Sequence, residues 1–236
     1  MSPPQSLAQR VIQLNNEAIV CAIKGFRQDG VATLQRALAM VLTCEESNQV
    51  SVVRPSNEQQ RDQMAYSVPL ARDQCSKPFD DVFQFFNRAI TLPQDDERFA
   101  TLSCPHSRIR IQTTILYNLG VFCHMEAVCS GNSTLAFANA LQFYGGAYQV
   151  LENSSKIFGF PHDDALLLVL ALFNNMGHIH SSFMMDSDKT RQCISWMQST
   201  FATPQTHNAL APEDYAFFSQ YISVPAGAQL LISPAA

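Results

Sequence analysis

The chain has 236 residues, of which 47% are apolar and 16 are phenylalanine, and its formal net charge is −5 at pH 7. This composition excludes a disordered chain, because a chain so rich in apolar side chains can bury enough surface to fold. The mild negative charge and the lack of a basic block argue against a nucleic-acid partner and against an anionic membrane.

The cysteines and the first residues indicate an intracellular location. Seven cysteines are scattered singly, without a CxxC pair, which is typical of reduced thiols. Residues 1–6 lack the charged region and the apolar run of a signal peptide. The longest apolar run, residues 165–173, is too short to span a bilayer. We therefore expect a cytoplasmic or nuclear protein that has no membrane partner.

Residues 7–43 are expected to form a first helical hairpin. Apolar side chains recur at three- and four-residue steps along its first half, which is typical of one face of a helix. Gly25 is expected to end the first helix, because glycine adopts positive φ at little cost. Asp29 is expected to cap the start of the second helix.

Residues 44–106 interrupt the helical pattern with prolines and polar runs. Residues 66–70 are short and β-prone. Residues 79–92 fit both the face of a helix and a buried strand, and their aromatic and β-branched side chains favour the strand. Since a compact domain rarely carries sixty residues of loop, we expect a small β-hairpin that packs on the helices, with a mobile part at residues 54–64.

Residues 107–153 are expected to form a second hairpin, with its turn and helix cap at residues 131–133. Gly145 and Gly146 lie inside its second helix, where each costs roughly 1 kcal/mol of helix stability relative to alanine. We expect the close approach of a neighbouring backbone to offset that cost.

Residues 161–201 are expected to form a third hairpin. Pro161 and the acidic pair Asp163 and Asp164 are typical of a helix start, because proline fits the first turn and carboxylates complement the helix dipole. Asp186 opens the stretch that is expected to end one helix and cap the next.

The tail, residues 202–236, has strand composition at residues 215–222. We expect this strand to pair with the one near residues 82–91, which would give a small sheet at one side of the helices. The whole chain, residues 1–236, is interpreted as a single domain of mainly α structure.

The three hairpins resemble tetratricopeptide (TPR) repeats, helix-turn-helix units of about 34 residues. The second hairpin carries the matching residues Leu116, Asn118, Leu119, Gly120, Ala140, Tyr144 and Ala147. The third carries Phe173, Asn175, Met176, Gly177, Thr190, Ile194 and Met197. The first carries Leu14, Asn16, Ala18, Gly30, Leu34 and Ala37, and Glu17 departs from the pattern. The resemblance implies a stack of about three hairpins, an α-solenoid.

A second resemblance rests on residues 85–89, which read Phe-Phe-Asn-Arg-Ala, followed by the Tyr-Asn-Leu-Gly helix at residues 117–120. Together these stretches resemble an uncharacterised TPR-like family that is expanded in diatoms. This resemblance brings no known activity, so it adds to the expected fold and leaves the function open.

Stacked hairpins of this type form a concave groove. In the TPR-like register its lining would be Asn15, Asn16, Ile19, Thr114, Tyr117, Asn118, Val121, His124, Asn174, Asn175, His178 and Ser181. The aligned Asn16, Asn118 and Asn175 could hydrogen-bond the backbone of an extended peptide, because an amide both donates and accepts. Alternatively, they could bond neighbouring helices. The lining has no Lys or Arg, so the resemblance disfavours a ligand held by its C-terminal carboxylate.

No pattern predicts a cofactor, a metal site or a catalytic residue. His178 and His180 would point to different faces of one helix, and zinc needs three or four ligands. A Cys–His nucleophilic pair is conceivable, but Cys123 and Cys193 lie on apolar helix faces and are better interpreted as small buried side chains.

The leading hypothesis is a non-enzymatic scaffold or adaptor that binds a protein, as a peptide or a helix in the groove or as a strand at the sheet edge. A second hypothesis is a constitutive subunit of a larger assembly, because three repeats are close to the minimum for stability. A third is an enzyme of unrecognised type.

Overall fold

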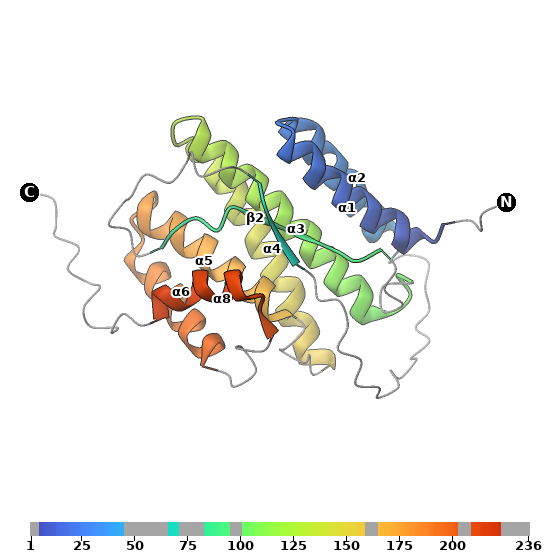
Figure 1. The fold of residues 1–236 in the computed structure, drawn as a ribbon. Coiled ribbons are helices and arrows are strands. Elements are labelled where there is room, and N and C mark those ends of the chain that lie inside the picture. Colours follow the sequence, from blue (N-terminus) through green and yellow to red (C-terminus); the bar gives the residue numbers. More distant parts are fainter. Residues whose placement is uncertain are drawn as a thin grey trace, which may run out of the picture. The chain divides into compact units, whose positions relative to one another are not determined.

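The computed structural model describes residues 5–44, 66–70, 83–94, 101–158, 165–202 and 209–222. These residues are mainly helical, with a small antiparallel sheet (Figure 1). The chain divides into two compact units. Unit 1 comprises Met1–Cys75 and Asn87–Phe160, and unit 2 comprises Ser76–Phe86 and Pro161–Ala236.

The first hairpin, in unit 1, consists of α1 (Leu7–Ile23) and α2 (Arg27–Thr43). Ser6 caps α1 by accepting a hydrogen bond from the Gln9 N–H at 3.2 Å. Gly25 ends α1 with a φ of 90°, as predicted. The cap expected at Asp29 is wrong: Phe26 occupies the N-cap position, and Asp29 lies in the first turn of α2, where its carboxylate complements the helix dipole.

The second hairpin, also in unit 1, consists of α3 (Pro105–Cys129) and α4 (Thr134–Phe158). Its turn is the predicted one, with positive φ at Gly131 and Asn132 and with the Ser133 hydroxyl accepting from the Ala136 N–H at 3.4 Å. Buried residues lie on every side of α3, because it packs against α2 and α4 and also lies beside the sheet.

The close approach expected at Gly145 and Gly146 is wrong. No described atom lies within 4 Å of a methyl group placed on Gly145, and only a leucine side chain does so at Gly146. Close packing occurs at Gly30 instead, where a methyl group would lie 2.9 Å from the Ala18 carbonyl oxygen. The missing side chain of Gly30 therefore allows α2 to pack directly on the backbone of α1.

The sheet belongs to unit 1 and consists of β1 (Tyr66–Pro69) and β2 (Arg88–Thr91). The register pairs Tyr66 with Thr91, Ser67 with Ile90, Val68 with Ala89 and Pro69 with Arg88. Within residues 79–92 the strand interpretation is confirmed for β2, and residues 83–87 precede it without helical structure. The first residues of that stretch, 79–82, and the expected mobile part at 54–64 lie outside the described residues.

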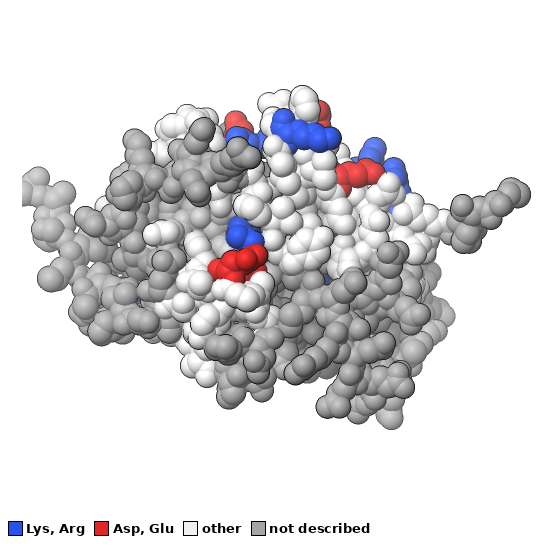
Figure 2. All heavy atoms as spheres, viewed as in Figure 1, with Lys and Arg blue, Asp and Glu red and all other residues white. Residues whose placement is uncertain are grey.

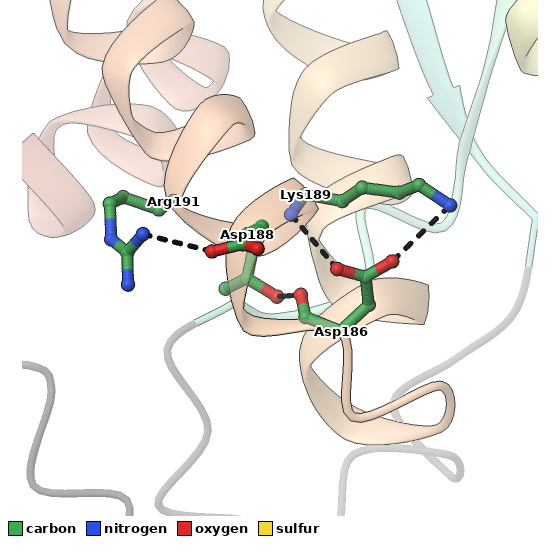
Figure 3. A network of polar contacts seen from close by, with 5 residues as sticks. Asp186, Asp188, Lys189 and Arg191 are labelled. Carbon is green, nitrogen blue, oxygen red and sulfur yellow. Dashed lines mark hydrogen bonds and ion pairs between the residues drawn. The ribbon is translucent and has the colours of Figure 1, made fainter.

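The third hairpin lies in unit 2 and consists of α5 (Leu166–Ser182) and α6 (Ser187–Phe201). Asp186 caps α6, as Figure 3 shows: its carboxylate accepts from the Lys189 N–H at 3.1 Å and pairs with Lys189 Nζ at 3.2 Å. The predicted start at Pro161, Asp163 and Asp164 lies outside the described residues.

The strand predicted at residues 215–222 is wrong, because these residues belong to α8 (Pro212–Ile222). Pro212, Glu213 and Asp214 form a favourable first turn, with proline at the start and two carboxylates near the positive end of the helix. Phe218 is fully buried. The aromatic side chains that suggested a strand therefore serve to pack a helix, and the strand near residues 82–91 pairs with β1 instead.

Among the described residues on the face in Figure 2, charged side chains are few, and blue and red side chains lie close together. Arg27 of α2 pairs with Glu126 of α3 at 3.6 Å in unit 1. Within the part of the chain that the structure describes, no helix is both long enough and apolar enough to cross a membrane.

Candidate functional site

Asparagine side chains of unit 1 hold the backbone of β2 and of the residue after it. The Asn118 side chain, on α3, accepts from the Ile90 N–H at 2.8 Å and donates to the Ile90 carbonyl at 2.8 Å. The Asn16 side chain, on α1, accepts from the Leu92 N–H at 3.2 Å and donates to the Leu92 carbonyl at 2.8 Å. Each amide thus satisfies both backbone groups of one residue. We call this arrangement an asparagine clamp.

The clamps occupy the edge of β2 that faces away from β1. Successive residues of a strand direct their backbone groups to opposite edges. Ile90 and Leu92 direct theirs to the asparagines. Arg88 directs its carbonyl to the same edge, where it accepts from the Tyr117 hydroxyl at 2.9 Å. Ala89 and Thr91 therefore direct theirs to β1. The helices supply along one edge of β2 the hydrogen bonds that a neighbouring strand would supply.

Asn15 connects the two clamps. Its amide nitrogen donates to the Ile90 carbonyl at 3.2 Å and to Asn16 Oδ1 at 3.1 Å, and its Oδ1 accepts from Asn118 Nδ2 at 2.9 Å. Asn15 and Asn118 are fully buried. Burying unpaired amides would be costly, and here the amides satisfy one another as well as the strand. For Asn118 the bond to a neighbouring helix, one of the two interpretations made from the sequence, is present, because it reaches Asn15 of α1. The binding of a partner peptide stays a prediction.

The same clamp recurs in unit 2 on α5. The Asn175 side chain accepts from the Phe86 N–H at 3.0 Å and donates to the Phe86 carbonyl at 3.2 Å. The adjacent Asn174 donates to the Gln84 carbonyl at 2.8 Å. Both asparagines are fully buried. The backbone that they hold again belongs to this chain, to the residues directly before β2.

Aromatic side chains anchor the clamped residues of unit 2. A methyl group placed on Gly177 would lie 2.5 Å from the ring of Phe83, so this ring rests where a larger residue on α5 would stand. The ring of Phe86 lies 4.9 Å from that of Phe217 and 4.8 Å from that of Phe218, both on α8. The extended segment is thereby held between α5 and α8.

His178 lies beside the same segment, with its ring stacked on Phe85 at 5.9 Å and edge-on to Phe183 at 5.3 Å. Burial lowers the pKa of His178 to about 4, so the ring is neutral at pH 7. Burial also lowers the pKa of His180. Ser181 donates to the His178 carbonyl at 3.3 Å.

The remaining residues of the predicted lining lie in the interior of unit 1. Ile19, Thr114 and Val121 are buried. His124 is also buried, and its Nδ1 lies 3.4 Å from the hydroxyl of Tyr144. They line no open surface in this structure, so their predicted part in binding stays a prediction.

Sequence reasoning missed the segment that the asparagines hold. Phe86, Ile90 and Leu92 lie in residues 79–92, a stretch that was interpreted only as a packed helix face or a buried strand. No alternation in the sequence marks their role, because apolar side chains fall at odd and even positions alike and Arg88 interrupts the even series. Their role became visible only once the structure placed the asparagines beside them.

The thiols with shifted pKa values are poor nucleophiles. Burial raises the pKa of Cys123 to about 11 and that of Cys193 to about 12, with nearby carboxylates adding to both shifts. Since the thiolate is the reactive form, these two cysteines are protonated at neutral pH and act as packing residues. Among the described residues, no group of three or more His, Cys, Asp or Glu side chains is placed to hold a metal ion.

The chemistry of the site is therefore recognition of a backbone. Asn16, Asn118 and Asn175 each bond the N–H and the carbonyl of one residue in an extended segment. Such bonds do not depend on the side chain of the residue that is held. No protein-family model matches the sequence, and no curated protein or solved structure matches it either.

Proposed function

We propose that this protein is a non-enzymatic scaffold or adaptor whose asparagine clamps bind an extended segment of a protein partner. The observation that carries the proposal is the repeated clamp itself. In the described part of the chain, Asn16, Asn118 and Asn175 each bond both backbone groups of a single residue. Apolar side chains at these positions would leave the clamped N–H and carbonyl groups without these partners, so the asparagines form a surface suited to an extended backbone.

Main-chain hydrogen bonds are the usual source of affinity when a protein captures a strand, and pockets for the side chains add selectivity. Unit 1 offers both. The asparagines of α1 and α3 meet the backbone, and the buried positions around Ala89 and Ile90 receive side chains. A partner segment with few charges and with both faces apolar suits these surroundings.

A TPR-like architecture belongs to the same proposal. Asn16, Asn118 and Asn175 each lie in the first helix of a hairpin and align in the repeat pattern. The contact of Gly30 with the Ala18 backbone is the kind of close packing between small residues that the repeat pattern implies. In unit 1, α2 packs against α3, as successive repeats of a solenoid do. These features support an α-solenoid of three hairpins.

Capture of partners from native lysate with quantitative mass spectrometry tests the proposal. Wild type is compared with Asn118→Ala and with Asn153→Ala, whose asparagine is exposed on α4. Circular dichroism must show that both variants are folded. We expect a partner that wild type and Asn153→Ala retain and that Asn118→Ala loses. Cross-links from the partner should fall on α1 and α3. Equal retention by all three chains would place binding elsewhere.

A constitutive subunit of a larger assembly predicts a different solution behaviour. An adaptor should be a monomer that melts cooperatively when made alone, whereas an orphan subunit should self-associate. Size-exclusion chromatography with light scattering on the purified chain separates the two.

A further inference from the structure

The clamps of unit 1 already hold a segment, and that segment is the chain's own β2 with Leu92. We propose that these residues are a built-in competitor, so that an outside segment binds only when they leave. We also infer that this outside segment carries the same order of side chains: a small residue, an aliphatic residue and, two positions later, a second aliphatic residue. The inference rests on the proposed function.

Competition follows from the saturation of the clamps. Asn118 uses its oxygen for the Ile90 N–H and its nitrogen for the Ile90 carbonyl and for Asn15. Asn16 uses its oxygen for the Leu92 N–H and its nitrogen for the Leu92 carbonyl. An outside backbone would need the same atoms at the same positions, so it and β2 cannot occupy the clamps together.

Exchange is physically accessible because β2 is attached to unit 1 by bonds that another strand could restore. Its pairing with β1 covers only four residues, and so short a strand pair has little stability of its own. Its other edge is held by side-chain amides instead of a strand. An entering segment would remake the bonds to Asn16, Asn118 and the Tyr117 hydroxyl one for one, so the clamps favour neither segment by backbone chemistry alone.

The side chains then determine which segment binds more tightly. The buried positions of β2 show which side chains the site accepts. Ala89 is 0% exposed and Ile90 is 1% exposed, although neighbouring residues of a strand point to opposite faces. Both faces of the strand are therefore covered. A residue larger than alanine at the first position would overpack its surroundings. Leu92 is 1% exposed and sets the second aliphatic position.

The test uses a fluorescent peptide with the sequence of residues 87–94, acetylated and amidated at its ends. It is titrated by anisotropy into wild type, Ile90→Asp and Tyr66→Asp. Ile90→Asp places a charge at a buried position of the competitor. Tyr66→Asp adds the same charge at a side chain of β1 that is 58% exposed. We expect Ile90→Asp to bind the peptide roughly tenfold or more tightly than wild type does, because the site is open more often. Tyr66→Asp should match wild type.

A second peptide carries an N-methyl group on the amide of the residue equivalent to Ile90. It keeps every side chain but cannot donate to Asn118, so it should bind Ile90→Asp roughly tenfold more weakly. In the wild-type chain, which needs no substitution, an excess of the first peptide should speed hydrogen exchange of the Ile90 and Leu92 amides. This measurement decides the question if Ile90→Asp does not fold.

The outcomes separate this inference from the proposed function. Tighter binding by Ile90→Asp, with loss on N-methylation, supports both. Equal binding by wild type and Ile90→Asp, without faster hydrogen exchange in β2, would show that β2 is not a competitor. The proposed scaffold function would be unaffected by that result. If no folded chain binds the peptide and exchange in wild type is unchanged, the inference is wrong and the clamps are a fixed part of the fold.

Discussion

The two units use the same backbone chemistry on different side chains. In unit 1, the clamps of α1 and α3 hold a regular strand, and the buried side chains of that strand are small or aliphatic, as at Ala89 and Ile90. In unit 2, the clamp of α5 holds residues without regular structure, and the anchors are the aromatic rings of Phe83 and Phe86.

This difference separates what is general in the clamp from what is local. An asparagine amide bonds any residue in an extended conformation, whichever side chain that residue carries. Selectivity must therefore come from the surroundings. Those of unit 1 fit a strand that is apolar on both faces, and those of unit 2 fit aromatic rings against Gly177 and α8. Substitutions in both units and a change of pH test this division. Trp196, the only tryptophan of the chain, reports on unit 2.

The largest effect is expected for Asn118→Ala in unit 1. The change leaves the Ile90 N–H and Asn15 Oδ1 buried without these partners. Each orphaned group costs roughly 1–3 kcal/mol, so the free energy of unfolding should fall by about 4 kcal/mol. Urea denaturation followed by circular dichroism measures the loss. Asn153→Ala, on the exposed face of α4, is the control and should stay within about 0.5 kcal/mol of wild type. Equal losses in the two variants would mean that the clamp contributes nothing.

Acidification should destabilise unit 2. The folded pKa of His178 is about 4, below its ordinary value of 6.5, so the unfolded chain binds a proton more readily between these values. The contribution of the neutral His178 ring to the free energy of unfolding is therefore fully present above pH 6.5. It is lost as the pH falls, which lowers the free energy of unfolding by about 3 kcal/mol at pH 4.

Urea denaturation at pH 7 and pH 4, followed by Trp196 fluorescence, measures this loss. The variant His178→Phe keeps a ring beside Phe85 and cannot titrate, so its loss should be smaller. The pKa of His180 is also lowered by burial, and this residue contributes the same share in both chains. An unchanged pH dependence in His178→Phe would remove His178 as the cause.

Two glycine substitutions should change stability in opposite directions. Gly177→Ala places a methyl group 2.5 Å from the Phe83 ring in unit 2, and such overpacking should cost about 2 kcal/mol. Gly145 lies in α4, and a methyl group there meets no described neighbour within 4 Å, so helix propensity should raise stability by about 0.5–1 kcal/mol. Trp196 fluorescence reports the first change and circular dichroism the second. Stabilisation by Gly177→Ala would show that Phe83 is not anchored there.

The smallest loss of stability is expected for Asn16→Ala. Asn16 makes a complete clamp on Leu92 but is only partly buried. Water can therefore replace its amide at little cost, and the loss should be about 1 kcal/mol. Hydrogen exchange of the Leu92 amide should quicken more than that of the Ile90 amide. A loss as large as that of Asn118→Ala would mean that the contribution of a clamp to stability does not depend on how deeply its asparagine is buried.

Local patterns were sufficient to predict the hairpins. The spacing of apolar residues predicted α1 to α6, and positive φ at Gly25 and Gly131 matched the expected turns. The prediction for the tail was wrong because the aromatic run that includes Phe217 and Phe218 suits a strand and a helix equally well. Its contacts with Phe86, far away in the sequence, accompany the helix. No local window contains that information.

The site was predictable in its chemistry and not in its occupant. The alignment of Asn16, Asn118 and Asn175 predicted amides that could bond an extended backbone, and they do so. That the backbone would be this chain's own did not follow, because an amide offers the same donor and acceptor to any partner. Ile90 lies 75 positions from Asn15 and 28 from Asn118. Only the folded chain brings them together.

These sequence separations have a consequence for the order of folding. The hairpins of unit 1 close through contacts between neighbouring helices, which form early because little chain entropy is lost. The bonds of Asn15 and Asn16 to Ile90 and Leu92 close loops of 75 and 76 residues, so they should form after the helices are in place. We expect refolding of unit 1 in two steps: a fast gain of helical signal, then a slower protection of the Ile90 amide. Between the two steps the helices would be formed while the asparagine clamps had not yet bound β2.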